Sequence, residues 1–164
     1  MIRLLSRKLR TDKRGAAVIE LALTAPILGA LVIGISDMTR AYSLKLLLEQ
    51  SAQRAIEQVE QQKSVASSYT STVTSEATSA MTDAGYSTGN SYSADAWLEC
   101  GSGGTWTRQT DFNGNCPNST DTTSRYVKIT ISRAFVPFFP SRAWPGANAQ
   151  GNIPVSGSAE VRVQ

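Results

Sequence analysis

The sequence contains no histidine and only two cysteines among its 164 residues. The absence of histidine excludes histidine general bases, Ser-His and Cys-His nucleophile pairs, and most zinc sites. Cys100 and Cys116, which enclose fifteen residues, make a poor metal site without histidine partners. No glycine-rich loop has a phosphate-binding form, and no spacing of serine, lysine and carboxylates singles out a nucleophile with its base. We therefore expect a protein that is not an enzyme and that uses no cofactor or metal ion.

Net positive charge is confined to the N-terminal segment. The first fifteen residues have a net charge of +5, whereas the remaining 149 residues have a net charge of −2. The basic residues after this leader are scattered and form no stripe along any segment. The composition therefore does not indicate a nucleic-acid surface, in spite of the overall charge of +3.

Residues 16–36 form an apolar run in which Glu20 is the only charged residue. About 20 helical residues cross the hydrocarbon core of a bilayer, so this run predicts a transmembrane helix over 16–37. By the positive-inside rule, the basic leader, 1–15, stays in the cytoplasm and everything after Asp37 is exported. A cleaved secretory signal usually has a shorter apolar region of about 7–15 residues. An uncleaved signal-anchor explains everything except Glu20 and its spacing from Gly15.

The stretch around this run carries an ordered set of features. A basic residue and glycine precede a small-residue pair, a glutamate, an apolar run with a proline, an acidic residue followed by arginine, and a Gln-x-Ala-x-Arg element. These features fall on Arg14, Gly15, Glu20, Pro26, Asp37, Arg40, Gln50, Ala52 and Arg54. In this order and spacing the stretch, about 40 of the 164 residues, resembles the TadE-like proteins, which are pseudopilins of tight-adherence (Tad/Flp) pilus systems.

The resemblance implies a minor pilin or pseudopilin, a structural or assembly component of a Tad/Flp-type pilus or secretion machine. It implies cleavage after Gly15 by a membrane aspartyl prepilin peptidase, which makes Ala16 the first mature residue and Glu20 the fifth. The expected partners are the inner membrane, the prepilin peptidase, other pilins or pseudopilins and the pilus assembly platform. The expected location is the bacterial inner membrane, single-pass, with a periplasmic C-terminal domain that is a candidate for incorporation into a surface pilus.

Cleavage would also give Glu20 a physical role. A free amino group on Ala16 would lie at the cytoplasmic edge of the bilayer, where the Glu20 carboxylate can pair with it in the same or an adjacent subunit. An isolated carboxylate at the bilayer centre costs about 2.5–3.5 kcal/mol on insertion scales, and such a pair could offset the smaller cost nearer the edge. The alternative is a glutamate whose side chain snorkels to the headgroups.

Two other function classes fit parts of the sequence. The first is a single-pass, signal-anchored periplasmic binding or interaction protein that is not cleaved and does not polymerise. The second is a general type II pseudopilin, a family that usually has phenylalanine at the first mature position, where this chain has Ala16. Removal of the leader separates the first of these from the pilin interpretation.

The helix is expected to continue past the membrane, because no glycine or proline interrupts residues 35–63. We predict one helix over about 17–62, with its exported part, 38–63, packed on a domain formed by 64–164. Its apolar face is expected to contain Tyr42, Leu44, Leu46–Leu48, Ala52, Ala55, Ile56 and Val59. The serine- and threonine-rich segment that follows is either a flexible linker or a second amphipathic helix. We favour a helix over 65–84, because apolar residues recur every three or four positions and Gly85 sits where a C′ glycine would end it.

The remaining chain predicts strands. Residues 126–135 and 155–163 alternate between apolar and polar side chains, which indicates half-buried antiparallel strands, and a third short strand is expected near 94–100. Residues 101–120 are rich in Gly, Asn, Asp and Ser and are expected to form a loop. The predicted fold is therefore α+β, with a long transmembrane-plus-amphipathic helix packed on a small antiparallel sheet in the manner of pilins, and a second helix.

Two features of the exported domain remain. On the far side of a membrane Cys100 and Cys116 would form a disulfide, which would tie down the loop. Between the two alternating strands, Phe138, Phe139 and Trp144 stand among three prolines. A rigid aromatic loop of this kind can be a partner surface. The rings could equally cap a small core beside the first helix.

Overall fold

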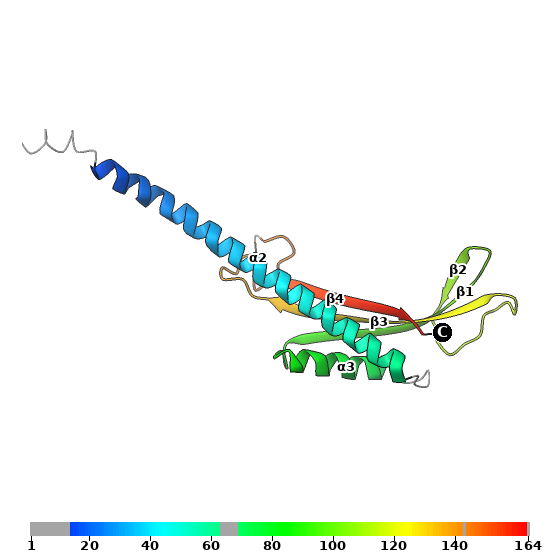
Figure 1. Ribbon diagram of the computed structural model, residues 1–164. Coiled ribbons are helices and arrows are strands. Elements are labelled where there is room, and N and C mark those ends of the chain that lie inside the picture. The colour runs from blue at the N-terminus through cyan, green and yellow to red at the C-terminus, as the bar shows by residue number, and fades with distance from the viewer. Residues whose placement is uncertain (1–13, 63–68, 143, 164) are drawn as a thin grey trace, which may run out of the picture. The chain divides into compact units, whose positions relative to one another are not determined.

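The structure is a computed structural model that describes residues 14–62, 69–142 and 144–163 (Figure 1). Most of the predicted leader, residues 1–13, lies outside the described residues, as do 63–68. Within the described ranges the elements are α2 (Arg14–Gln62), α3 (Tyr69–Asp83), β1 (Asn90–Ser102), β2 (Thr105–Gln109), β3 (Thr122–Phe135) and β4 (Ile153–Arg162). The predicted α+β class is confirmed. The chain divides into two compact units, 1–40 and 41–164.

The described part of the first unit is the beginning of α2. The helix runs through Pro26 without ending, although proline removes one backbone donor. It is long and apolar enough to cross a membrane, and none of its most apolar window is buried by the rest of the protein. Its large apolar side chains are therefore left for another environment to cover.

The second unit contains a four-stranded antiparallel sheet with the strand order β2-β1-β3-β4. The central strand β3 places Val127, Ile129 and Ile131 on one face, where all three are fully buried. The neighbouring strands present alanine on both sides of Ile129, which pairs with Ala94 of β1 and with Ala159 of β4. The alternation that predicted β3 and β4 thus has its ordinary cause, a sheet with one covered face and one polar face.

Both helices contribute to the core on the covered face. The buried residues of α2 in this unit recur at helical spacing and are Leu44, Leu48, Ser51, Ala52, Ala55, Ile56 and Val59. The helix backbone approaches the sheet closely at Gly157 of β4. A Cβ atom there would lie 2.4 Å from the Glu49 nitrogen and 2.5 Å from the Leu48 carbonyl carbon. Only glycine leaves room for α2 at this depth.

The second predicted helix is present as α3, and the linker alternative is wrong for its described residues. Val73, Ala77, Ala80 and Met81 face the core. Gly85 has φ +86° and ends the helix as predicted. The amide of Gly85 donates to the Thr82 carbonyl at 2.9 Å and that of Tyr86 donates to the Met81 carbonyl at 2.8 Å, which is the Schellman arrangement.

Three sequence-based expectations need correction. The predicted loop over 101–120 contains strand β2, joined to β1 by a two-residue turn. Gly103 and Gly104 both have positive φ there, as a type I′ hairpin turn requires. The third strand, expected near 94–100, is longer at both ends. Tyr42 and Leu46 lie outside the buried stripe of α2, because at about 100° per residue they point away from Leu44 and Leu48.

The close contact at Gly157 gives a stability prediction. Gly157→Ala should lower the free energy of unfolding of the second unit by about 1–3 kcal/mol, because the added methyl group meets backbone rather than a movable side chain. The measurement is the urea midpoint of the full chain in detergent, followed by the near-ultraviolet signal of buried Trp97. Ser158→Ala, an exposed neighbour, is the control. Equal midpoints for the two variants would contradict the packing argument.

Candidate functional site

The residues that carry the family resemblance all lie on α2, and the first of them is at its beginning. Gly15 is the second residue of the helix and is exposed. The Gly15–Ala16 peptide bond therefore lies at the N-terminal limit of the described part of α2. A Cβ atom on Gly15 would meet nothing within 4 Å. The fold itself therefore places no demand for glycine at this position.

Glu20 lies one helical turn beyond Ala16 and its side chain is exposed. Four residues correspond to a rise of about 6 Å, and positions four apart share one face of a helix. The Thr24 hydroxyl donates to the Glu20 backbone carbonyl at 2.9 Å. This hydrogen bond involves the backbone of Glu20 and not its carboxylate. A positive charge at position 16 would be within reach of that carboxylate.

The acidic residue and arginine after the apolar run form an ion pair. Asp37 Oδ1 lies 3.1 Å from the Arg40 guanidinium, and the Asp37 side chain is only 15% exposed. The three-residue spacing brings both side chains to the same side of the helix. Sequence reasoning missed this ion pair, although the three-residue spacing was a sufficient signal.

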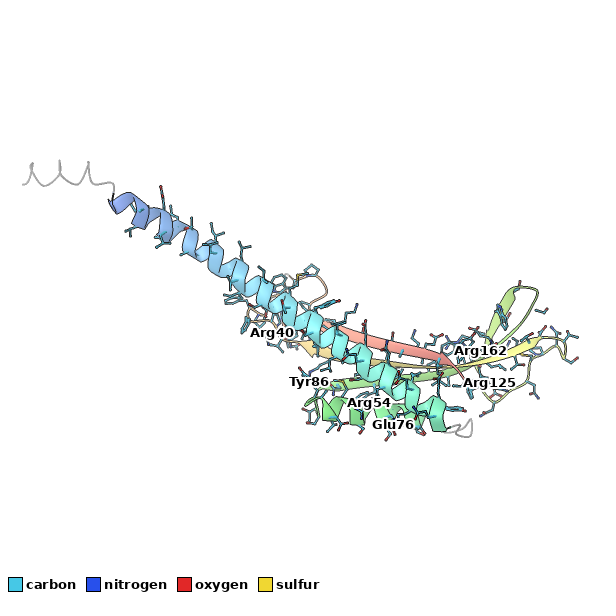
Figure 2. All side chains as sticks on the ribbon, in the orientation of Figure 1. Arg40, Arg54, Glu76, Tyr86, Arg125 and Arg162 are labelled. Atoms are coloured by element: carbon cyan, nitrogen blue, oxygen red, sulfur yellow. A yellow bond between two sulfur atoms is a disulfide. The ribbon has the colours of Figure 1, made fainter. Side chains whose placement is uncertain are left out.

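The Gln-x-Ala-x-Arg element serves the packing of the second unit. Ala52 is completely buried. Arg54 contacts Asp83 of α3 at 3.2 Å, and both side chains are more than half exposed, so this pair contributes at most about 1 kcal/mol (Figure 2). It links the two helices over the sheet. Sequence reasoning missed this pairing because the two residues are on different elements.

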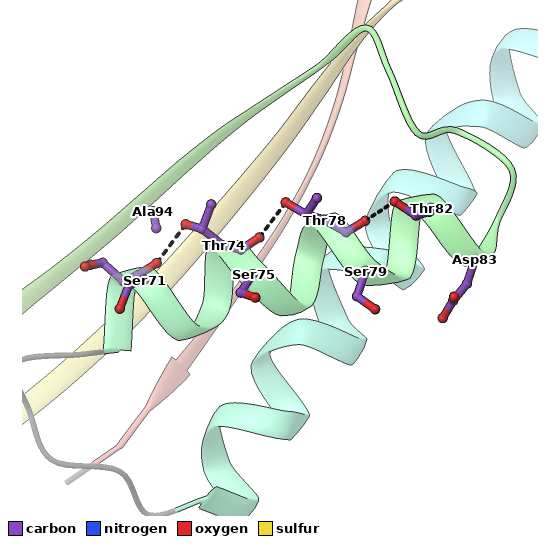
Figure 3. Close-up of a pocket in the computed structure, with 9 residues that line it drawn as sticks. Ser71, Thr74, Ser75, Thr78, Ser79, Thr82, Asp83 and Ala94 are labelled. Atoms are coloured by element: carbon purple, nitrogen blue, oxygen red, sulfur yellow. Dashed lines mark hydrogen bonds between the residues drawn. The ribbon is translucent and has the colours of Figure 1, made fainter.

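A shallow recess runs along the outer side of α3 and is lined by its serines and threonines with Ala94 of β1 (Figure 3). Its threonine hydroxyls donate to carbonyls one turn earlier in the same helix. Thr74 donates to Thr70 and Thr78 to Thr74, at 2.7 and 2.8 Å. Asp83 is the only ionisable group among the described residues that line the recess, and it is bonded to Arg54. The recess thus offers no nucleophile with a neighbouring base.

The two cysteines are joined in a disulfide, as the sequence predicted. The bond closes a loop that folds over the covered face of the sheet. Phe112, inside this loop, is buried and packs edge-on against Tyr69 of α3 with ring centroids 5.6 Å apart. Arg125 holds the same loop, because its guanidinium donates to the Phe112 carbonyl at 2.9 Å and to the Gly114 carbonyl at 3.2 Å (Figure 2). The loop therefore completes the core.

The aromatic residues between β3 and β4 do not cap the core. Phe138, Phe139 and Trp144 are all exposed, whereas Pro137 beside them is buried. The Trp144 indole N–H donates to the Phe139 carbonyl at 3.1 Å, so these residues are fixed relative to one another. Of the two interpretations offered for this segment, the structure is consistent with an open surface.

Comparison with known proteins gives one match. A family model described as TadE-like protein matches residues 15–56. The resemblance seen in the sequence is confirmed over this stretch, which includes Gly15, Glu20, the Asp37–Arg40 pair and Arg54. No curated protein and no solved structure matches the chain. The match ends within α2, so the sheet and α3 are not included in it.

The disulfide predicts both a redox state and a stability. In protein alkylated during lysis of intact cells, non-reducing peptide mapping should show the Cys100–Cys116 pair linked. The double variant Cys100→Ser/Cys116→Ser should lower the free energy of unfolding of the second unit by about 3 kcal/mol, the value expected for a closed loop of roughly 15 residues. Wild-type protein treated with a reductant should match the double variant. Two free thiols in protein taken directly from cells would argue against export.

Proposed function

We propose that this chain is a TadE-like minor pilin or pseudopilin, a structural or assembly component of a Tad/Flp-type pilus or secretion machine. The observation that carries the proposal is the family match over 15–56, because it coincides with a single unbroken helix whose first part is apolar and uncovered. Such a helix gives one element two uses, as a membrane anchor and as the packing partner of the second unit.

The charge distribution supports an orientation. The leader, 1–15, has a net charge of +5 and precedes the apolar run, so it remains in the cytoplasm and the second unit is exported. We assign 16–37 to the inner membrane, 38–63 to the exported continuation of the helix and 64–164 to the periplasmic domain. The disulfide supports the same orientation, because such bonds persist in oxidising compartments.

The position of Gly15 supports processing by a prepilin peptidase after this residue. Gly15 is exposed and lies between the basic leader and the apolar run, 16–36. Glycine lowers helix propensity by about 1 kcal/mol relative to alanine and so favours an extended bond at this point. Since packing among the described residues does not require glycine at position 15, a tight peptidase site would supply the reason for its small size.

Cleavage would change the electrostatics around Glu20. In the intact chain the first turn of α2 contains no acidic residue. After cleavage the helix would begin at Ala16, and Glu20 would lie near both the new ammonium group and the positive end of the helix dipole, each of which favours a carboxylate. The same carboxylate can instead reach the ammonium group of a neighbouring subunit, and this is the mechanism we propose for setting register during assembly.

Gly15→Leu should leave an uncleaved precursor that still inserts into the membrane. A Cβ atom at position 15 meets no described residue within 4 Å, so the substitution is expected to leave the packing of the described residues unchanged. Intact mass of membrane-extracted protein, with and without the cognate peptidase, measures the outcome. Gly34→Leu is the matched control, because its surroundings are equally open and it is far from the bond, and it should be processed normally. A wild-type N-terminus at Met1 would remove the main support for the pilin assignment.

Glu20→Val should spare insertion and damage assembly. The span becomes more apolar, so insertion should be at least as good, whereas a charge-assisted contact worth about 1.5–3 kcal/mol is lost. That loss corresponds to roughly a ten- to hundredfold weaker association between subunits. The measurement is recovery of partner pilins with the variant and with wild type at matched abundance, with leader removal scored in the same samples. Equal recovery and equal pilus output would leave only the snorkelling alternative.

A further inference from the structure

Exposed apolar side chains of the second unit are concentrated between β3 and β4. Four of them, Val136, Phe138, Phe139 and Trp144, are 54%, 59%, 63% and 46% exposed, and they are called the aromatic patch below. Elsewhere in the described part of this unit the large apolar side chains with such exposure are Tyr42, Leu46 and Trp106. Large exposed apolar patches usually mark a surface that another component covers.

The patch is held in its exposed form by its own segment. The Trp144 indole N–H donates to the Phe139 carbonyl, and the Arg142 side chain donates to the Ala149 carbonyl at 2.6 Å. Gly151 closes the base of the segment so tightly that a Cβ atom would lie 2.6 Å from the Ser141 nitrogen. The rings therefore need no reorganisation to meet a partner, and because the indole N–H is already used, they would act by burial of apolar area.

The patch lies at the end of the second unit where the chain enters from the apolar span. Gly157 of β4 packs on Leu48 and Glu49, and α2 and β4 run in the same direction (Figure 1). The segment that precedes β4 is therefore at the end where α2 enters this unit. Along the helix, Ala41 is five residues, or about 7.5 Å, past the last residue of the apolar run. The headgroup layer on each side of the hydrocarbon core is about 5–8 Å thick.

The chemistry of the segment fits a phospholipid surface. Residues 136–152 contain one arginine, Arg142, and no carboxylate, so phosphate headgroups would meet no acidic side chain of this segment. Tryptophan and tyrosine are enriched at membrane interfaces, and the exposed Tyr42 belongs to the same end of the unit. A neighbouring pilin would also bury aromatic rings. It would not account for the position of the patch at the end of the unit where α2 enters.

We propose that the aromatic patch rests in the headgroup region of the exported leaflet and holds the second unit against the bilayer while the subunit is unassembled. This inference rests on the membrane insertion and export proposed above. It adds a lipid contact that is separate from the transmembrane helix. Withdrawal of the patch from lipid would then accompany entry of the subunit into an assembly.

The test uses the full chain in nanodiscs that contain anionic phospholipid and a lipid with a spin label at the headgroup, which quenches nearby tryptophan. Trp144→Phe should lose at least half of the quenching, and Trp106→Phe should lose little. Trp106 is a matched control, since it is similarly exposed, at 48%, but pairs with Gly101 at the other end of the sheet. Thirteen steps along β3 separate the two ends, a distance of about 43 Å. Buried Trp97 remains in both variants and reports folding.

A second variant leaves Trp144 in place. Phe138→Ser/Phe139→Ser should reduce the quenching by more than half, and nanodiscs of neutral lipid should give less quenching than anionic ones. Equal quenching of the Trp106→Phe and Trp144→Phe proteins would overturn the proposal. So would protection of Trp144 from aqueous iodide that appears only when a partner pilin is added. Leader removal is scored by intact mass in the same samples. Uncleaved protein with a quenched Trp144 would thus support the lipid contact while opposing the pilin assignment.

Discussion

The contact of α2 with β4 at Gly157 is the constraint on which the rest of the second unit depends. Because Gly157 has no side chain, the helix backbone at Leu48 and Glu49 rests directly on the strand. Because the helix lies so close to the sheet, small residues such as Ala52 and Ala55 are fully buried. The covered face of the sheet is shared between α2 and the shorter α3. The same helix is continuous with the apolar span, so one part of α2 packs on the sheet and the other part is not covered by the described protein.

The predictable parts of the fold are those with a strong local pattern. The alternation in β3 and β4, the length of α2 and the glycine that ends α3 each follow from nearby residues alone. Strand β2 was missed because it has five residues, is almost entirely exposed and shows no alternation. The near-continuous apolar run around Leu44–Leu48 identified a helix but not which side would be buried, so Tyr42 and Leu46 were misplaced. The Arg54–Asp83 pair depends on the packing of two elements, which a local pattern does not contain.

The matched stretch contains two kinds of residue. Asp37 with Arg40, Ala52 and Arg54 have partners or packing within this chain, and the structure accounts for them. Gly15 and Glu20 have no such account, because a Cβ atom on Gly15 meets open space and the Glu20 carboxylate is exposed. For Gly15 and Glu20, the proposed contacts with a peptidase and with another subunit supply a reason that packing among the described residues does not.

The position of Phe112 links the packing of the core to formation of the Cys100–Cys116 disulfide. The ring fills the core from within the loop that the disulfide closes, so before oxidation that loop is held without its covalent link. For a chain that crosses a membrane, thiols on the cytoplasmic side stay reduced and the bond forms only after passage. In the orientation proposed above, the second unit would gain its last increment of stability after export. A precursor awaiting translocation would be easier to unfold, and the exported product would be harder to return through the membrane.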